Sequence, residues 1–254
     1  MHNYPRVLQD QVAIVTGGTR GVGFGLATAL ARAGADLAVV SRNPRQGQEA
    51  AEALAGWGGR VKYIEADVTR LSDLQRMVDE TLKEYGKIDI LVNNAGTAIT
   101  RPVLDTTEEE WDRVIDTNLK SVFFACREVG KVMISRQKGK IINIASISGQ
   151  SASPLIASYC ASKAGVIQLT KALALEWARY RINVNAIGPG YIRTDLNKKE
   201  LENEKVYQSI VSRIPFRTLA KEDDLSGALI YLASEASDYV TGHTLFVDGG
   251  WLAN

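Results

Sequence analysis

The 254-residue sequence contains only two cysteines and two histidines, and its charges almost balance. So few Cys and His argue against a disulfide scaffold and against a Cys/His zinc site, and we expect no metal. A net charge of +1 provides no basic patch for nucleic acid or for a membrane surface. No apolar run approaches the roughly 20 residues of a membrane helix, and the N-terminus lacks the apolar core of a signal peptide. We therefore expect a cytoplasmic protein that acts on a small molecule.

What the sequence does contain is a regular alternation of short β-branched runs and longer helical stretches. This alternation predicts one α/β domain over residues 1–254, with a parallel sheet and helices on both faces. A polar stretch at about 191–215 interrupts it; we interpret this stretch as a substrate lid, with a solvated surface helix as the alternative. Strands are expected at 12–16, 36–41, 60–66, 88–93, 140–145, 182–187 and 244–247, and helices at 21–33, 45–56, 71–85, 107–136, 155–180 and 222–233.

A glycine-rich turn follows the first expected strand. Its spacing, Gly-x-x-x-Gly-x-Gly, sets Gly17, Gly21 and Gly23 between a strand and a helix. Glycine is needed where the backbone turns tightly and approaches a ligand without an obstructing Cβ. The N-terminus of the next helix offers N–H groups and a partial positive charge to a pyrophosphate. The turn therefore predicts a dinucleotide site, and a tight turn without a ligand is the alternative.

The end of the second expected strand indicates which dinucleotide binds. An acidic residue there would bind a ribose 2′-hydroxyl, but this chain has Ser41, Arg42 and Asn43. Arg20 lies within the glycine turn itself. Two guanidinium groups and a hydroxyl suit a 2′-phosphate, which arginine binds through charge-assisted bonds. The pattern favours NADP(H), NAD(H) stays possible, and two merely solvated arginines are the alternative.

A serine, a tyrosine and a lysine have a spacing that suits proton transfer. Tyr159 and Lys163 are four positions apart on an expected helix, so their side chains share one face. An ammonium about 4 Å from a phenol would lower the pKa of that phenol toward neutrality. Ser146 follows the fifth expected strand and could stabilise charge on a substrate oxygen. These residues predict a hydride-transferring enzyme with a tyrosine as acid and base.

These motifs, in this order, resemble the short-chain dehydrogenase/reductase family over nearly the whole chain. The family fold is a Rossmann-type sheet of seven strands in the order 3-2-1-4-5-6-7. The matching elements are the Thr-Gly-x-x-x-Gly-x-Gly turn, Asp67-Val68, Asn93-Asn94-Ala95-Gly96, Asn118 in Asp-Thr-Asn-Leu, Ser146 with Tyr159 and Lys163, and Pro189-Gly190 followed by Thr194.

The resemblance implies a role for each matching residue. Asn118 would join Ser146, Tyr159 and Lys163 in a catalytic tetrad, its backbone holding a water in a proton relay. Lys163 would also hydrogen-bond the nicotinamide ribose. The implied cofactor-binding residues are Gly17, Thr19, Arg20, Gly21, Val22, Gly23, Ser41, Arg42, Asn43, Asp67 and Val68 at the adenine, Asn94, Ala95, Gly96, Tyr159, Lys163, and Pro189, Gly190, Ile192 and Thr194 around the nicotinamide.

The C-terminal stretch 242–254 resembles the sugar-acid branch of this family, typified by gluconate 5-dehydrogenase and 2-deoxygluconate 3-dehydrogenase. Such a carboxylate substrate needs a cation, for which Arg101 and Arg193 are candidates, and Ser148 is a further candidate substrate contact. Relatives of this branch often have basic residues after Asn-Asn-Ala-Gly, where this chain has Ile99 and Thr100. A 3-oxoacyl-(acyl-carrier-protein) reductase and a catalytically inactive, cofactor-sensing regulator are the alternatives. The resemblance also implies a homotetramer.

Overall fold

The computed structural model describes residues 6–194 and 201–253. A parallel sheet with the strand order β3-β2-β1-β4-β5-β6-β7 forms its centre. The order predicted by the resemblance is confirmed. The strands are β1 (Val12–Thr16), β2 (Asp36–Ser41), β3 (Val61–Glu65), β4 (Ile90–Asn93), β5 (Gly139–Ile144), β6 (Ile182–Pro189) and β7 (Thr244–Val247).

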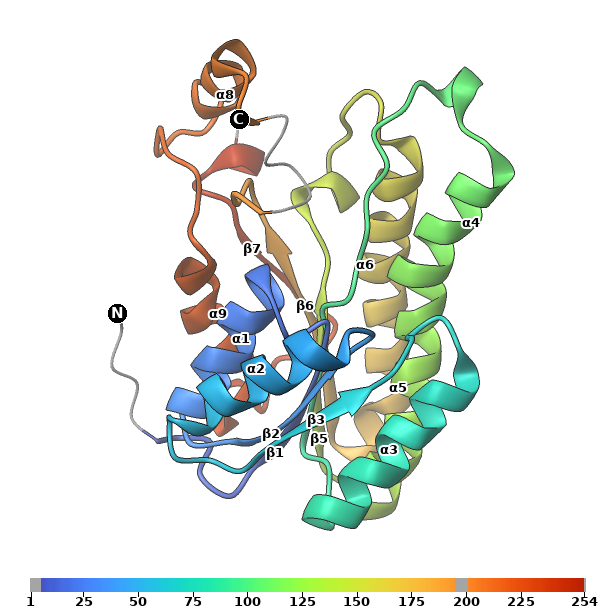
Figure 1. Cartoon of the computed structure of the whole chain (residues 1–254), viewed down its shortest axis with the longest axis vertical. Coiled ribbons are helices and arrows are strands. Elements are labelled where there is room, and N and C mark those ends of the chain that lie inside the picture. The colour runs from blue at the N-terminus through green and yellow to red at the C-terminus, as the bar shows by residue number, and fades with distance from the viewer. Residues whose placement is uncertain (1–5, 195–200, 254) are drawn as a thin grey trace.

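Helices cover both faces of the sheet (Figure 1). One face carries α1 (Gly21–Arg32), α2 (Pro44–Ala55) and α9 (Ser226–Ala233). The other carries α3 (Leu71–Tyr85), α5 (Ser121–Arg136) and α6 (Ala157–Trp177). Figure 1 shows the first three helices on the left of the sheet and the last three on its right.

The strands supply both hydrophobic cores because successive side chains point to opposite faces. In β1, Ala13 and Val15 pack into the core under α1 and α9, and Ile14 packs into the core under α3 and α5. All five residues of β1 are buried, as are all four of β4. Burial on both sides explains why these strands are continuous apolar runs instead of alternating ones.

The long helix expected at 107–136 is divided in the structure. It consists of α4 (Glu108–Ile115), a single π-helical turn η2 (Asp116–Lys120) and α5. Thr107 begins α4 with a capping box, its hydroxyl accepting from the backbone N–H of Glu110. In η2 the N–H of Ser121 donates to the carbonyl of Asp116, five residues earlier. Such π-turns are rare and occur mostly at functional sites.

The polar stretch expected to form a lid lies only partly within the structure. Residues 195–200 are outside the described residues, and α8 (Glu204–Val211) lies at the top of Figure 1. The side chain of Asn203 caps α8 by accepting from the N–H groups of Lys205 and Val206. A small apolar cluster holds this segment to the C-terminal turn through Leu201, Ile210, Ile214, Trp251 and Ile147.

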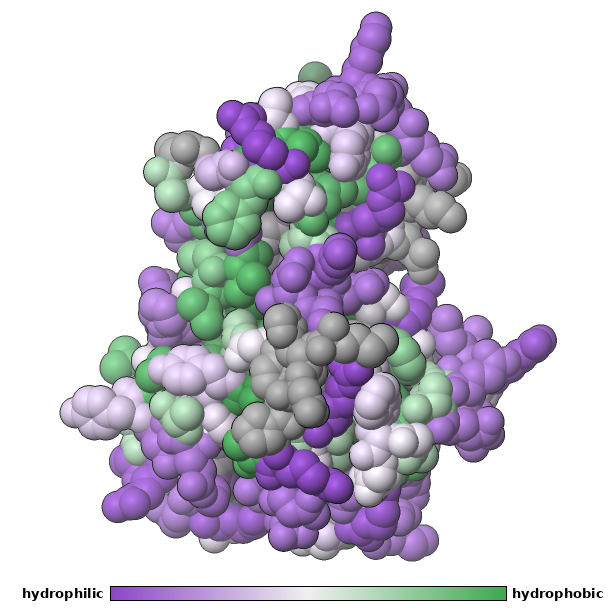
Figure 2. Space-filling model, turned by 90° about the vertical axis from the view of Figure 1, so that its left-hand side faces the viewer, coloured by the Kyte–Doolittle hydropathy of each residue, from purple (hydrophilic) through white to green (hydrophobic). Residues whose placement is uncertain are grey.

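The surface beside α1 and α9 is uneven in hydropathy. Hydrophilic side chains dominate the lower part of this face, whereas apolar ones gather in its upper part, toward the level of α8 (Figure 2). Phe216, between α8 and α9, is 78% exposed. Within the described residues, no helix combines the length and the apolar character that crossing a membrane requires.

Candidate active site

The carboxyl ends of the parallel strands meet at one edge of the sheet, and a pocket of about 450 Å³ opens there. Ligands of such sheets bind at this edge, near the point where the strand order reverses. In this sheet the reversal lies between β1 and β4. Most of the predicted cofactor-binding residues line the pocket: Gly17, Thr19, Arg20, Gly21, Val22, Gly23, Ser41, Arg42, Asn43, Asp67, Val68, Asn94, Ala95, Gly96 and Thr194.

The glycines of the first turn are required by its geometry. Gly17 adopts φ +64, a conformation that other residues rarely adopt. A Cβ at Gly23 would lie 2.0 Å from the carbonyl oxygen of Gly17 and 2.4 Å from Nδ2 of Asn94, which is impossible without moving the backbone. Gly21 adopts φ +50, and a Cβ there would meet no protein atom within 4 Å. The turn is thus packed tightly on the protein side and is open at Gly21.

Asn94, directly after β4, joins the glycine turn to the centre of the sheet. Its Nδ2 donates to the carbonyls of Thr16 at 3.0 Å and Gly17 at 3.2 Å. The hydroxyl of Thr16 accepts from the backbone N–H groups of Asn94 and Ala95, at 3.0 and 3.2 Å. These bonds fix the ends of β1 and β4 against each other, at the point where the strand order reverses.

The adenosine side of the pocket contains the predicted basic residues. Arg20 and Arg42 are both exposed at its rim. The hydroxyl of Ser41 is buried and has no hydrogen-bond partner. Asn43 caps α2 by accepting from the N–H of Gln46 at 3.1 Å. Thr69 donates both its N–H and its hydroxyl to Asp67, which orders the loop after β3.

The structure brings Ser146, Tyr159 and Lys163 together. Ser146 lies two residues after β5, and its Oγ accepts from the N–H of Ser148 at 3.1 Å. Tyr159 and Lys163 lie on one face of α6, and Nζ of Lys163 lies 5.7 Å from the centre of the tyrosine ring. Nζ donates to the carbonyl of Ile144 at 2.7 Å, so the last residue of β5 holds the lysine in place.

The charge states of this cluster are dominated by burial. Burial lowers the pKa of Lys163 from 10.5 to about 8. Burial also raises the pKa of Tyr159, and a hydrogen bond from Ser146 acts in the opposite direction. The expectation that Lys163 brings the pKa of this phenol toward neutrality is therefore not met by the protein alone. The reason is desolvation, the largest cause of both shifts, because burial disfavours the charged form of each group.

Asn118 lies in the π-turn, and its side chain is fully engaged. Its Oδ1 accepts from the N–H of Thr97 at 2.8 Å, and its Nδ2 donates to the carbonyl of Thr97 at 2.8 Å and to Oγ of Ser162 at 3.0 Å. The amide thus joins the loop after β4 to α6. This leaves the backbone of the π-turn, and not the Asn118 side chain, as the part that could hold a water.

The residues predicted around the nicotinamide follow β6. Pro189 pairs with Val247 of β7, and the N–H of Gly190 donates to the carbonyl of the same Val247. A Cβ at Gly190 would lie 2.7 Å from the Cα of Asp248, so the two segments need glycine to pass. Ile192 is buried in the core, and Thr194 reaches the pocket.

The predicted substrate residues have different surroundings. Arg101 forms an ion pair with Glu110 of α4 at 2.9 Å, and its charge is therefore compensated. The guanidinium of Arg193 lies 5.8 Å from the ring centre of Tyr207 of α8. Ser148 is in the short 3-10 helix after Ser146. The structure brings Ser148 beside Ser146 and pairs Arg101 with an acid.

Several residues of the site were missed by the sequence reasoning. They are Thr16, which orients the turn after β4, and Thr97 and Ser162, which hold Asn118. Tyr191 was missed as well; its charge helps to raise the pKa of Tyr159, and its ring lies 5.0 Å from that of Trp251. The hydroxyl of Thr16 at a strand end was an available signal, but the contacts of the others join segments far apart in the chain.

Comparison with known proteins agrees with this arrangement. The sequence profile of a family described as enoyl-(acyl carrier protein) reductase matches residues 17–252. The chain is 42% identical over 247 residues to a 2-dehydro-3-deoxy-D-gluconate 5-dehydrogenase of Escherichia coli, covering 97% of both proteins. The chain belongs to the short-chain dehydrogenase/reductase family.

Two further relatives show the range of activities among proteins similar to this chain. A gluconate 5-dehydrogenase of Burkholderia cenocepacia, solved in complex with NADP and tartrate, is 38% identical and superposes with a TM-score of 0.95 over 98% of both chains. A 3-oxoacyl-(acyl-carrier-protein) reductase of Chlamydia muridarum is 40% identical over 96% of this chain and 98% of that protein. The chain is therefore an oxidoreductase of this family, related to dehydrogenases of sugar acids and also to a reductase of acyl thioesters.

Proposed function

We propose that this protein is an NADP(H)-dependent oxidoreductase that interconverts a secondary alcohol and a ketone of a sugar acid. The observation that carries the proposal is the cluster of Ser146, Tyr159 and Lys163 near a dinucleotide-sized pocket: a Cβ at the pocket residue Gly96 would lie 3.8 Å from Nζ of Lys163. The relation to 2-dehydro-3-deoxy-D-gluconate and gluconate 5-dehydrogenases supports the substrate class.

The pocket residues suit a phosphorylated dinucleotide. The open space above Gly21 and the tight packing of Gly23 make a turn whose backbone N–H groups can approach a pyrophosphate. At the other end, Arg20 and Arg42 flank Ser41, whose hydroxyl lacks a partner. Two guanidinium groups suit a 2′-phosphate better than a ribose hydroxyl. The related structure of the Burkholderia cenocepacia enzyme contains NADP.

Tyr159 exchanges the proton at the substrate oxygen, and a nicotinamide held in the pocket would supply or take up the hydride. Ser146 hydrogen-bonds the same oxygen and steadies the charge that develops on it. The ammonium of Lys163 lies beside the tyrosine ring and favours its phenolate. The π-turn at Asn118 provides backbone groups for a water that passes the proton toward solvent. These residues therefore handle the proton, while the hydride is left to the nicotinamide.

The segment 191–215 acts as a lid over the substrate. Its described part rests on the C-terminal turn, because Ile210 and Ile214 pack against Trp251. The N–H of Phe216 donates to the carbonyl of Gly249, which anchors the end of the lid. A lid that excludes water would strengthen every electrostatic interaction of the tetrad. The chain 1–254 then works as one Rossmann domain carrying its own lid.

A 3-oxoacyl-(acyl-carrier-protein) reductase is the second candidate, favoured by the 40% identity to such an enzyme of Chlamydia muridarum. The two candidate functions differ only in the substrate, because both use the same nucleotide pocket. An acyl-carrier substrate would require a basic docking surface, and the net charge of +1 does not favour one.

The test is a spectrophotometric screen that follows the oxidation state of the nicotinamide. It compares gluconate, 5-ketogluconate, 2-dehydro-3-deoxygluconate, neutral polyols and acetoacetyl thioesters, each with NADP(H) and NAD(H). We expect turnover of a sugar acid with a preference for NADP(H). Activity on thioesters alone would reverse the order of the two candidates, and equal efficiency with NADH would contradict the cofactor preference.

A further inference from the structure

The short connection between β2 and α2 carries residues that favour a phosphorylated cofactor. Ser41 ends β2, Arg42 and Asn43 follow it, and α2 begins at Pro44. The first three of these residues line the nucleotide pocket. Arg42 is exposed, and its guanidinium has no hydrogen bond or ion pair with any described residue. The position of this arginine is therefore set by the main chain on either side of it.

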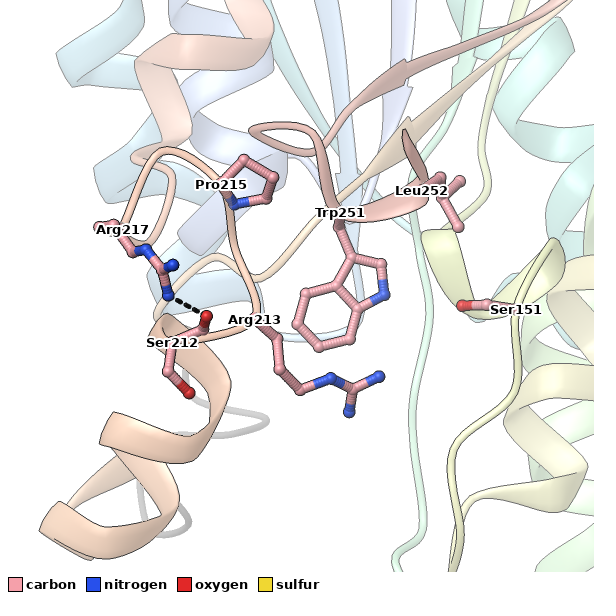
Figure 3. A pocket seen from close by; sticks show the side chains of 7 residues that line it. All are labelled: Ser151, Ser212, Arg213, Pro215, Arg217, Trp251 and Leu252. Atoms are coloured by element: carbon pink, nitrogen blue, oxygen red, sulfur yellow. Dashed lines mark hydrogen bonds between the residues drawn. The ribbon is translucent and has the colours of Figure 1, made fainter. Parts of the chain in front are cut away.

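A second pocket, of about 580 Å³, shows a different arrangement (Figure 3). It lies beside the C-terminal turn and is lined by the loop after β5, the stretch that follows α8 and the turn after β7. The guanidinium of Arg213 lies 4.3 Å from the centre of the Trp251 ring there. Arg217 donates to the carbonyl of Ser212 (Figure 3). Those arginines are directed by contacts of their side chains, whereas Arg42 is directed by its main chain.

A tyrosine of the neighbouring strand fixes the main chain before Arg42. The hydroxyl of Tyr63, in β3, donates to the carbonyl of Ser41 at 2.9 Å. The same carbonyl accepts from the N–H of Ala66 at 3.0 Å. Burial raises the pKa of Tyr63 above its ordinary value, so the hydroxyl keeps its proton and is a donor at neutral pH. Two donors thus hold the carbonyl of Ser41 at the edge of the pocket.

The main chain after Arg42 is fixed by the first turn of α2. The side chain of Asn43 accepts from the N–H of Gln46 at 3.1 Å, and its carbonyl accepts from the N–H of Gly47 at 2.9 Å. Gly47 also packs on the tyrosine: a Cβ there would lie 2.1 Å from Cε2 of Tyr63. Glycine is a poor helix former, and this close packing is the reason for its place in α2. Tyr63 thus contacts both ends of the connection, the strand end with its hydroxyl and the helix with its ring.

We propose that Tyr63 is a positioning residue for the choice of cofactor: it holds Ser41 and Arg42 where they meet the 2′-phosphate of NADP(H). The inference rests on the proposed function, in which these two residues bind that phosphate. A connection that is fixed beforehand loses little freedom when the ligand binds, so more of the contact energy becomes affinity. NAD(H) lacks the phosphate and gains much less. Tyr63 thereby favours NADP(H) without being part of the pocket lining.

The experiment measures the dissociation constants of NADPH and NADH by fluorescence titration of the full-length protein, which requires no substrate. Tyr63→Phe removes one hydroxyl and keeps the ring against α2. We expect the dissociation constant of NADPH to rise about three- to tenfold, the effect of losing one hydrogen bond between neutral groups. The dissociation constant of NADH should change by less than about twofold, and kcat at saturating NADPH should stay unchanged.

Tyr85→Phe is the matched control. Tyr85, the last residue of α3, donates its hydroxyl to the carbonyl of Leu37 at 2.7 Å. Leu37 lies near the start of β2, at the opposite end of the strand from Ser41. The control therefore removes the same kind of bond from the same strand, but away from the pocket. It should lower Tm about as much as Tyr63→Phe and leave both dissociation constants unchanged.

A double variant tests whether Tyr63 acts through Arg42. Arg42→Ala removes the side chain that Tyr63 is proposed to position. Adding Tyr63→Phe to Arg42→Ala should therefore weaken NADPH binding much less than Tyr63→Phe does in the wild-type protein. Independent residues would instead have effects on the dissociation constant that multiply.

The outcomes separate the inference from the proposed function. If Tyr63→Phe lowers Tm but leaves the ratio of the two dissociation constants unchanged, Tyr63 is only structural and the inference is wrong. Effects of Tyr63→Phe and Arg42→Ala that multiply would also refute it. If NADPH binding alone is weakened, the inference stands whichever substrate the screen identifies. If wild-type protein binds NADH as tightly as NADPH, the cofactor preference of the proposed function fails and the inference fails with it.

Discussion

The two ends of the candidate site are built in different ways. At the nucleotide end, main chain meets main chain: a Cβ at Gly23 would lie 2.0 Å from the carbonyl of Gly17. At the pocket beside the C-terminal turn, side chains from three distant segments form the lining, and Arg213 stacks on Trp251. Gly23 at the first end tolerates no added atom, whereas a side chain that lines the second pocket can be exchanged without moving the main chain. One scaffold can therefore keep its cofactor and change its substrate.

The largest effect is expected from Tyr159→Phe, which should lower the rate of the chemical step without weakening the binding of cofactor or substrate. Removing the hydroxyl removes the proton donor and acceptor, so kcat should fall by about 10²- to 10⁴-fold. The affinities for NADPH and for the substrate should change little, because the ring remains. Steady-state kinetics and NADPH fluorescence titration measure the two effects.

Tyr180→Phe is the matched control for this change. Tyr180 lies at the end of the α6 region, where its ring contacts Arg179. Its variant should keep full activity. An active Tyr159→Phe protein would show that another group transfers the proton, and a loss of NADPH binding would show that the two ends are not separable.

The second prediction tests how closely the main chain of the glycine turn is packed. Gly23→Ala puts a methyl group against the Gly17 carbonyl, so the turn must open. We expect a loss of about 3 kcal/mol in the free energy of unfolding, the upper range for overpacking, and a weakened affinity for NADPH. Urea unfolding and cofactor titration measure both.

Gly58→Ala provides the comparison for backbone strain alone. Gly58 has φ +94 and open space where the Cβ would be, so the cost should be about 1 kcal/mol with no change in NADPH affinity. If Gly23→Ala lowers the free energy of unfolding no more than Gly58→Ala does, the glycine turn can move to accommodate a methyl group.

Lys163 lies where the two ends meet, and its buried charge should cost stability. Its pKa is about 8 in the folded protein and 10.5 ordinarily. Below pH 8 Lys163 is charged in both the folded and the unfolded protein, and the folded protein bears the full free-energy cost of burying that charge. Between pH 8 and 10.5 the unfolded state binds more protons, so wild-type stability rises with pH. Lys163→Met should thus be inactive but about 2 kcal/mol more stable at pH 7, less so at pH 10.

Lys140→Met should behave in the opposite way. Lys140 is also buried, but its Nζ donates to Asp238 at 2.7 Å, so removal leaves that carboxylate without its partner. Urea unfolding of the cofactor-free proteins at pH 7 and pH 10 gives the comparison. A Lys163→Met protein that is less stable than wild type at pH 7 would contradict the inference that the buried charge of Lys163 destabilises the folded protein.

The smallest effect concerns the adenosine rim. Arg42→Ala should raise KM for NADPH by about tenfold, because one charged contact to the 2′-phosphate is worth about 1.5 kcal/mol. KM for NADH should not change. Arg45→Ala, three residues on, removes an exposed arginine that pairs with Glu49 at 3.1 Å and should affect neither cofactor. A parallel rise for NADPH and NADH would assign Arg42 to general attraction instead of phosphate recognition.

Most of the fold could be predicted from the sequence because its strands are buried on both faces. The bounds of β1, β2 and β7 agree with the expectation, and the others differ by a few residues at their ends. The helix expected at 107–136 was wrong as one continuous element. Its interruption depends on Asn118, whose amide is held by Thr97 and Ser162. No local pattern reveals contacts of that kind.

The sequence by itself determined the nucleotide end, because glycine spacing and a strand-terminal asparagine act within a few residues of where they stand. It also predicted that Tyr159 and Lys163 share one face of a helix, because they are four positions apart. The tertiary structure alone decided the charge states, because desolvation of Tyr159 and Lys163 depends on everything packed around them. It also decided what the arginines contact: Arg101 pairs with Glu110, and the guanidinium of Arg213 lies over the ring of Trp251. Those partners are brought together only by folding.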